Sequence, residues 1–235
     1  MSNLSSIRLF ATHPHDCSYL PGEEATTVFV DPATEIDAEL YSRLSELGFR
    51  RSGRHLYRPR CESCQACVPA RIPVADFKPD RRQKRCLKRN QDLVVCEVGN
   101  IASDEHYQLY EAYINGRHAD GDMYPPSREQ FDSFLTNEWG VTRFLEFRLE
   151  GKLLAVAVTD QLDNGLSAVY TFYDPEQTRR SLGVFAVLHQ VQRAYAAGLP
   201  AVYLGYWIKQ CHKMAYKIDY RPLDLLVQNH WVRVN

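Results

Sequence analysis

The chain alternates between two spacings of apolar residues, and each spacing predicts a different kind of element. Ile36, Leu40 and Leu44 recur at helical spacing, and Gly48 follows them as a C-cap. Runs rich in β-branched and aromatic residues, bounded by Gly or Pro, predict strands. In the first hundred residues we expect helices at 36–47 and from 79 onward, and strands at 25–31, 49–58 (a hairpin), 68–74 and 93–98.

The rest of the chain is predicted to form strands, a helix and further strands. Turn signals at Glu150-Gly151 and Asp163-Asn164-Gly165 separate three strands. The expected helices are 103–116, 127–137, 183–197 and 209–217, and the expected strands are 143–148, 153–161, 166–173, 201–207 and 223–234. This order is similar to that of the acetyltransferase-like (GNAT-like) fold. We therefore expect an α+β protein with a GNAT-like C-terminal half (100–235) packed on a smaller, Cys-containing and basic α/β N-terminal half (1–99).

Composition changes this picture mainly through charge. The chain has 235 residues, of which 45% are hydrophobic and 24% charged, as is typical of a soluble globular protein. It shows no signal peptide and no run of about 18 apolar residues, so we expect a cytoplasmic protein with no membrane partner. The net charge is −1, but residues 41–100 hold 14 Lys and Arg against 6 Asp and Glu, whereas the remainder holds 14 (28 − 14) against 23 (29 − 6). This asymmetry favours a local anion-binding face, and a solvated helix face is the alternative.

Two neighbouring motifs carry the chemistry of this basic region. Cys61, Cys64 and Cys67 are spaced so that one loop can present several thiolates to one metal ion or cluster. The segment 78–89 (KPDRRQKRCLKR) follows, and its clustered cations indicate a polyphosphate partner. Taken alone, the two motifs are also typical of a non-catalytic zinc-ribbon protein that binds nucleic acid, but this interpretation leaves the second half of the chain unused.

A further candidate site lies at residues 180–183 (RSLG), between a predicted strand and a predicted helix. Free backbone N–H groups and the helix dipole bind anions at such a position. In coenzyme A enzymes a second small residue follows the glycine two positions later, but Phe185 stands there in this chain. This disfavours a coenzyme A-dependent N-acetyltransferase and leaves a related acyl donor open. An ordinary strand–helix turn is the alternative.

Eight segments in a fixed order reveal a resemblance over nearly the whole chain. With them, the sequence resembles the bacterial aminoacyl-tRNA–protein transferases of the N-end rule pathway, which are similar to eukaryotic arginyl-tRNA–protein transferases. The segments are CSYL (17–20), FRRSGRHLYRPR (49–60), CESCQAC (61–67), QKRCLKRNQDL (83–93), HADGDMYPPSREQF (118–131), VYTFYDP (169–175), RSLGVFAVL (180–188) and YLGYWIKQCHKMAYKIDYRP (203–222).

The resemblance implies transfer of an amino acid from tRNA to the α-amine of a protein whose first residue is Asp or Glu. An aminoacyl ester is already activated, so the reaction needs positioning, a proton acceptor and oxyanion stabilisation rather than a covalent nucleophile or a cofactor. The short, bacterial-like chain favours Leu as the donor residue, and Arg is the alternative. The implied partners are aminoacyl-tRNA, most simply leucyl-tRNA, and an acidic N-terminus, with no DNA.

The matching positions imply roles for individual residues. Asp174 is expected to orient or deprotonate the attacking amine. Lys213 and Lys217, four residues apart on one helix face, are expected to bind the acidic side chain of the acceptor, and Tyr206 and Trp207 to line the acyl pocket or belong to the core. The residues expected to bind aminoacyl-tRNA are Arg180, Ser181 and Gly183 at its terminal nucleotide and Lys78, Arg81, Arg82, Lys84, Arg85, Lys88 and Arg89 at the phosphates of its acceptor stem.

The resemblance also raises the question of a metal. In the eukaryotic relatives, an N-terminal Cys-x-x-Cys pair and a later adjacent pair bind a metal or an iron–sulfur cluster. This chain retains Cys17, but Leu20 stands where the second cysteine of the first pair would be. The set expected to supply four thiolates for zinc or a cluster is Cys17, Cys61, Cys64 and Cys67, with buried free thiols as the alternative.

Overall fold

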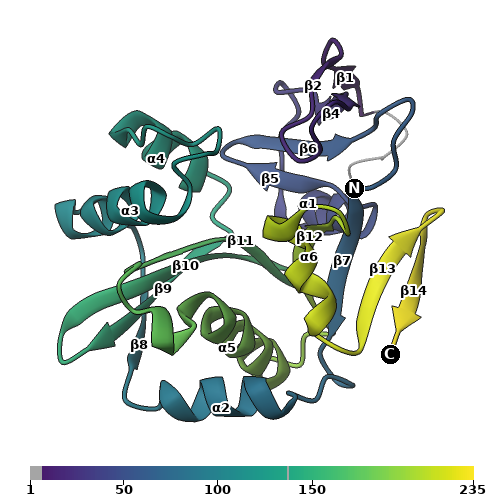
Figure 1. Ribbon diagram of the computed structural model, residues 1–235. Coiled ribbons are helices and arrows are strands. Elements are labelled where there is room, and N and C mark those ends of the chain that lie inside the picture. The colour runs from purple at the N-terminus through teal and green to yellow at the C-terminus, as the bar shows by residue number, and fades with distance from the viewer. Residues whose placement is uncertain (1–6, 137) are drawn as a thin grey trace.

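The computed structural model describes residues 7–136 and 138–235 of the chain. A twisted eight-stranded sheet lies at its centre, in the order β14-β13-β7-β12-β11-β10-β9-β8 (Figure 1). Its strands are β7 (Val68–Pro73), β8 (Val94–Val98), β9 (Thr142–Leu149), β10 (Lys152–Leu162), β11 (Gly165–Tyr173), β12 (Ala201–Trp207), β13 (Leu223–Val227) and β14 (His230–Val234). A smaller sheet, β1-β4-β6-β5, and a two-stranded pair contain β1 (Leu9–Ala11), β2 (His15–Asp16), β3 (Glu24–Ala25), β4 (Thr27–Val30), β5 (Arg50–Ser52) and β6 (His55–Pro59).

Three of the helices begin where capping side chains predict that they begin. Asp80, Ser103 and Ser127 each accept a hydrogen bond from the backbone N–H three residues later, which satisfies a donor that the first turn leaves free. The predicted helix 127–137 ends at Leu135, and residue 137 lies outside the described part of the chain. The helical segments are α1 (Ala38–Glu46), α2 (Arg81–Arg89), α3 (Asp104–Arg117), α4 (Arg128–Leu135), η2 (Thr178–Arg180), α5 (Leu182–Ala196), α6 (His212–Ala215) and η3 (Tyr216–Asp219).

Helices cover both faces of the central sheet. α5 packs on β11 and β12 with α2 beside it, whereas α3 and α4 lie on the opposite face (Figure 1). β10 is therefore buried on both sides: Leu154 and Ala157 belong to the core under α5, and Val156 and Val158 belong to the core under α3. No helix of residues 7–136 and 138–235 is long and apolar enough to cross a membrane.

Strands from both parts of the sequence pair within the central sheet. β7 lies between β12 and β13 and is antiparallel to both, and β8 forms the edge next to β9. The protein is thus a mixed α and β protein with one large mixed sheet, as the sequence pattern predicted in outline. The boundary predicted near residue 99 stays a prediction, although it coincides with no boundary of the sheet because β7 and β8 precede it.

β11 and β12 form a fork that shapes the molecule. These two parallel strands pair only through Leu166 with Val202 and Ser167 with Tyr203, near the start of each strand. Beyond this point they separate, and Gly205, with a φ of +82°, lies at an irregularity in the pairing of β12 with β7. A space opens between the two strands where they diverge.

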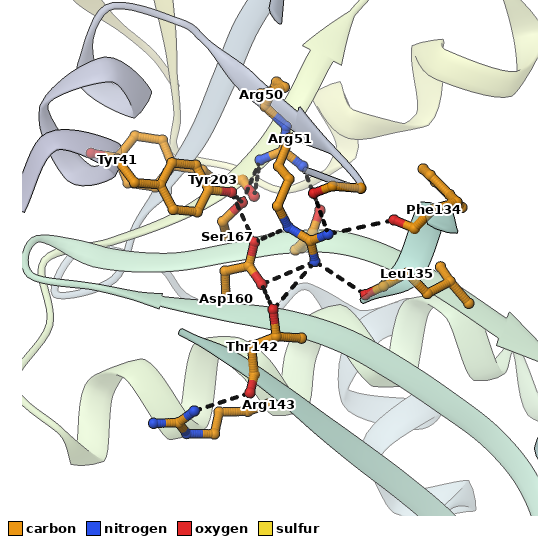
Figure 2. Close-up of polar contacts among 12 residues, drawn as sticks. Tyr41, Arg50, Arg51, Phe134, Leu135, Thr142, Arg143, Asp160, Ser167 and Tyr203 are labelled. Atoms are coloured by element: carbon orange, nitrogen blue, oxygen red, sulfur yellow. Dashed lines mark hydrogen bonds and ion pairs between the residues drawn. The ribbon is translucent and has the colours of Figure 1, made fainter. Parts of the chain in front are cut away.

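The β5–β6 hairpin is fixed to the central sheet by a buried ion pair (Figure 2). Arg51 Nε lies 2.6 Å from Asp160 Oδ2, and neither side chain is exposed to solvent. Asp160 also accepts hydrogen bonds from the hydroxyls of Tyr41 (2.9 Å) and Thr142 (2.7 Å). Arg51 donates further to the carbonyls of Gly53 and Leu135, so the hairpin, β10 and the end of α4 meet at one guanidinium.

Replacing Arg51 by Met is expected to lower the free energy of unfolding by about 3–5 kcal/mol, because Asp160 would stay buried without its cation. Replacing both residues, Arg51→Met with Asp160→Leu, is expected to recover part of this loss, since no unpaired charge remains. Urea unfolding of the single and double variants measures both effects. A single-variant loss below about 1 kcal/mol, as for an exposed pair, would contradict this role.

Candidate active site

A cleft of about 1080 Å³ opens at the fork between β11 and β12. Its walls come from both diverging strands, from the start of α5, from the β5–β6 hairpin and from α6 and η3. Representative lining residues are Tyr170 of β11, Gly205 of β12, Gly183 of α5, Arg50 of β5 and Lys217 of η3. The cleft therefore combines residues that lie far apart in the sequence.

The N-terminus of α5, close to the helix start that the sequence predicted at Gly183, forms one wall of the cleft. Ser181 precedes the helix in the left-handed region, with a φ of 54°, and both Ser181 and Gly183 line the cleft. A Cβ on Gly183 would lie 3.3 Å from Cε1 of Tyr173, so glycine lets this turn pack closely against β11. The free N–H groups of the first turn therefore lie in the cleft wall, where they can donate to an anion or a developing oxyanion.

Phe185 does not act as the sequence suggested. We expected its bulk to keep the backbone away from a pyrophosphate, but its ring is buried and packs against Phe147 and His189, with ring centroids 5.4 and 6.3 Å away. The side chain points into the core under α5. Its size is a packing feature, and the steric argument against coenzyme A was wrong at this residue.

α2 joins the basic region to the loop that precedes α5. Its inner face is polar: Cys86 and Asn90 both donate to the carbonyl of Arg180, and the Gln83 side chain donates to the carbonyl of Asp219. Its outer face carries cations that are all exposed and that form no ion pair with a carboxylate in the described part of the chain. These cations, together with Lys78 just before the helix, are Arg81, Arg82, Lys84, Arg85, Lys88 and Arg89.

Arg180 and Asp174 lie beside the cleft and are engaged elsewhere. Arg180 forms a two-pronged ion pair with Asp92, at 2.8 and 2.9 Å, and this bond lowers the pKa of Asp92. Asp174 accepts from the Glu176 N–H at 3.0 Å and pairs with Lys152 Nζ at 3.2 Å. Neither residue lines the cleft, although Pro175 does. A catalytic role for Asp174 stays a prediction.

Lys213 and Lys217 both line the cleft but lie in different surroundings. Lys213 belongs to α6, is exposed, and pairs with Asp120 at 2.6 Å. Lys217 belongs to η3 and is only 3% exposed; its Nζ lies 3.3 Å from Met214 Sδ and 4.8 Å from the centre of the Tyr216 ring. Burial, with a smaller effect of the nearby Arg50 charge, lowers the pKa of Lys217 to about 7.

Tyr206 and Trp207 take different positions, as successive residues of a strand do. Tyr206 lines the cleft but is 2% exposed, and its hydroxyl donates to the carbonyls of Gly48 and Tyr57. Trp207 packs against the core under α5 and is not part of the cleft wall. Both placements agree with the core alternative.

The four expected metal-binding cysteines lie near one another. Cys17, Cys61 and Cys67 line the cleft, and Cys64 does not. Burial, followed by the neighbouring thiols, raises the pKa of Cys67 to about 12. Within residues 7–136 and 138–235, no three His, Cys, Asp or Glu side chains are placed to hold a metal ion. This arrangement does not fit the expected zinc or iron–sulfur site.

Sequence reasoning did not identify Arg50 as a cleft residue. Its guanidinium lies at the fork and donates to Ser167 Oγ (2.8 Å), the Ala168 carbonyl (2.6 Å) and the Tyr203 carbonyl (3.4 Å), where the pairing of β11 and β12 ends (Figure 2). The only signal in the sequence was its position in the FRRSGRHLYRPR segment. That segment supported the resemblance without indicating a role for this residue.

Comparisons with known proteins find similar sequences along the whole chain. Residues 15–85 match the model of the arginine-tRNA-protein transferase N terminus, and residues 105–227 match that of its C terminus. The chain is 60% identical to an aspartate/glutamate leucyltransferase of Pseudomonas fluorescens (strain Pf0-1) and 60% identical to one of Stutzerimonas stutzeri (strain A1501), with all of both chains covered in each case. An enzyme of the same name from Teredinibacter turnerae is 58% identical over 100% of this chain and 97% of its own.

A solved structure shares the fold. It is the C-terminal domain of a protein named as a lysylphosphatidylglycerol synthetase from Agrobacterium fabrum, with a TM-score of 0.50 and 15% identity. The match covers 83% of this chain and 62% of that one. At this identity the likeness concerns the fold alone.

Burial of Lys217 predicts a specific dependence of stability on pH. Its pKa is about 7 in the folded protein and about 10.4 when unfolded, so between these values the unfolded chain binds more protons and stability rises with pH. Relative to Lys217→Met, the wild-type free energy of unfolding is expected to rise by up to about 1.4 kcal/mol per pH unit in this window.

Urea unfolding between pH 6 and 10 measures this difference. Lys213→Met is the matched control, because it removes a lysine from the neighbouring helix that is already exposed and paired with Asp120. If the free energy of unfolding of wild type and of Lys217→Met changed in parallel with pH, the lowered pKa of Lys217 would be contradicted.

Proposed function

This chain belongs to the arginine-tRNA-protein transferase family, and we propose from this premise that it transfers an amino acid from aminoacyl-tRNA to the α-amine of a protein that begins with Asp or Glu. Such a modification marks the acceptor for degradation by the N-end rule pathway. The reaction belongs in the cytoplasm, where aminoacyl-tRNA is made. The observation that carries the proposal is the cleft at the fork, whose walls hold both the N-terminus of α5 and the buried Lys217.

Leu is the proposed donor residue. Relatives that are 58–60% identical over the whole chain carry the name aspartate/glutamate leucyltransferase, which supports both this donor and the acidic acceptor. Arginyl transfer is the second candidate, because the matching family model is named for arginine.

The finer fold assignment is part of the proposal. A GNAT-like sheet is supported by two parallel strands that separate after a short pairing and by a helix that begins next to the gap. The parallel connection from β11 through α5 to β12 places the α5 N-terminus at the open end of the fork. In open α/β sheets, ligands bind in crevices of this kind.

The chemistry requires two substrates to meet in the cleft. The acceptor amine loses a proton and attacks the ester carbonyl; the ester C–O bond then breaks, the ribose oxygen leaves with a proton, and a peptide bond remains. Ser181 and the first-turn amides near Gly183 are proposed to hold the acyl–ribose end and the developing oxyanion. The cleft is at the upper end of the range for ligand sites, about 300–1000 Å³, which suits two partners.

The residues around the acceptor contribute either a positive charge or apolar surface in this proposal. Lys217 is proposed to bind the acidic side chain, because it is buried in the cleft without a carboxylate partner among the described residues. Lys213 contributes at the exposed edge, where Asp120 already pairs with it. Tyr206 supplies apolar wall through its ring, and Trp207 supports that wall from the core.

Asp174 is proposed to position the attacking amine. It lies between Tyr173 and Pro175, which both line the cleft, and the Lys152 that holds its Oδ2 is 69% exposed. An ion pair to so exposed a lysine contributes little, so a substrate ammonium can replace it.

The outer face of α2 is proposed to bind the acceptor stem. Its exposed cations lie on the same helix whose inner face holds the loop before α5, so a tRNA bound there brings its 3′ end toward the cleft. Contacts of this kind are electrostatic and largely independent of sequence. A bound cofactor takes no part in any of these steps.

Purified protein is expected to transfer labelled Leu from leucyl-tRNA to peptides that begin with Asp or Glu and not to otherwise identical peptides that begin with Lys or Ala. Arginyl-tRNA and acetyl-coenzyme A serve as competing donors in separate reactions. Transfer from arginyl-tRNA alone would show that the donor residue is Arg rather than Leu. Incorporation from acetyl-coenzyme A alone would overturn the proposal. Binding of tRNA without transfer would favour a non-catalytic nucleic-acid-binding protein.

Replacing Arg81, Arg85 and Lys88 together by Gln is expected to weaken binding of aminoacyl-tRNA. Each lost phosphate contact is expected to reduce the slope of log K against log salt by about 0.7–0.9. Filter binding from about 50 to 200 mM salt measures the slope. Arg54→Gln is the control, since Arg54 is exposed in the hairpin turn away from α2; an equal effect of this variant would show a non-specific loss of charge.

Asp174→Asn is expected to lower kcat by about 100-fold or more, because an amide can accept from Glu176 N–H but cannot attract an ammonium. The thermal midpoint is expected to stay near the wild-type value. Lys152→Gln is the matched control for the ion pair. Turnover within a few fold of wild type would remove Asp174 from the site.

A further inference from the structure

Two cations of the cleft are shielded from solvent, wholly or in part, and have no carboxylate partner in the described part of the chain: Arg50 and Lys217. This distinguishes them from Lys213, which pairs with Asp120 at the exposed edge, and from Arg51, which pairs with Asp160 in the core. Unpaired charges in a low-dielectric site are costly, so such a pair is expected to have an anionic ligand. The remaining charged residues of the cleft wall, Arg117, Asp120 and Asp122, are exposed, as Lys213 is; the two histidines are His15, exposed, and His118, half-buried.

Arg50 is held in a fixed position with donors to spare. Nη1 and Nη2 bond to Ser167 and to the carbonyl of Ala168, which fixes the plane of the guanidinium at the fork (Figure 2). Arginine has five N–H donors, and these bonds leave others for a ligand. Gly205 stands next to it: a Cβ there would lie 3.2 Å from Arg50 Nε, so this glycine leaves the Nε side of the guanidinium uncovered.

Lys217 lies close enough to Arg50 to be affected by its charge. After burial, Arg50 is the largest cause of the lowered pKa of this lysine, and Cys211 acts in the opposite direction. Two like charges that share one cleft repel each other until an anion lies between them. A carboxylate in this place would relieve the repulsion, keep Lys217 protonated and accept from the planar guanidinium.

We propose that Arg50 and Lys217 together form the receptor for the side-chain carboxylate of the acceptor's first residue, and that Arg50 sets the specificity for acidic N-termini. This inference rests on the proposed transfer to Asp and Glu N-termini. The neutral amides Asn and Gln have nearly the same shape, but they leave both cations without a counter-charge. Discrimination against them therefore arises from charge, and the hydrogen bonds to Ser167 and Ala168 hold the guanidinium part of that charge in place.

The test compares acceptors that differ only in charge. For wild type, Arg50→Gln and Arg50→Lys, kcat and KM are measured at saturating leucyl-tRNA with peptides beginning Asp, Glu or Asn, and folding is checked by thermal unfolding. Arg50→Gln retains an amide donor for the Ala168 carbonyl but removes the charge. It is expected to lower kcat/KM about 100-fold for Asp and Glu peptides, mainly through KM, and to change the Asn value less than about threefold. Arg50→Lys keeps the charge and is expected to lie between.

An equal loss for Asp and Asn peptides would show that Arg50 only supports the fork and would overturn the inference, as would an unchanged preference. If Arg50→Gln does not fold, Lys217→Met carries the same comparison, because it removes the other cation without removing a hydrogen bond to the backbone.

The proposed function can fail separately. If wild type transfers Leu to no peptide, that proposal falls, and fluorescence anisotropy with labelled Asp and Asn peptides still tests the receptor. Preferential binding of the Asp peptide by wild type, lost in Arg50→Gln, would support it. Equal binding of both peptides by wild type would overturn it.

Discussion

The cleft depends on one buried ion pair, between Arg51 and Asp160. Both charges are removed from solvent and fully hydrogen-bonded, so the β5–β6 hairpin cannot leave the sheet without exposing or orphaning them. Arg50 precedes Arg51 in β5, and it bonds to Ser167, which is the cross-strand partner of Asp160; fixing Arg51 on Asp160 therefore also places Arg50 at the fork. There its guanidinium bonds to both diverging strands (Figure 2). The pairing of Arg51 with Asp160 in the core thus determines where the positive charge of Arg50 lies in the cleft.

The same anchoring explains why N-terminal residues line a cleft formed mostly by C-terminal strands. β7 lies between β12 and β13, and the loop that carries Cys61 and Cys67 precedes β7, so the cysteine segment is brought to the cleft by strand pairing. The thiols therefore lie near the reaction site because of topology. This position gives the cysteine run a place in the wall of the cleft without requiring a bound metal.

Local elements could be predicted from the sequence because their signals are local. The caps at Asp80 and Ser103 and the turn at Gly53 involve neighbours in the chain, and the helices and the hairpin formed where these residues predicted. The order of the strands could not be predicted, since β7 pairs with strands more than 120 residues away. For the same reason, nothing in the sequence showed that Arg50 reaches Ser167 and Tyr203.

The lysine pair shows how a correct local pattern can still mislead about chemistry. A spacing of four residues predicted equivalent neighbours on one helix face, but α6 ends at Ala215 and a tighter 3₁₀ turn follows. Lys213 therefore reaches Asp120 at the surface, while Lys217 turns into the cleft toward Met214. Lys213 and Lys217 are one helical turn apart, yet the first forms a solvated ion pair and the second is buried with its pKa lowered to about 7. Because burial and pairing decide the charge of a lysine, its role follows from the tertiary structure rather than from its spacing.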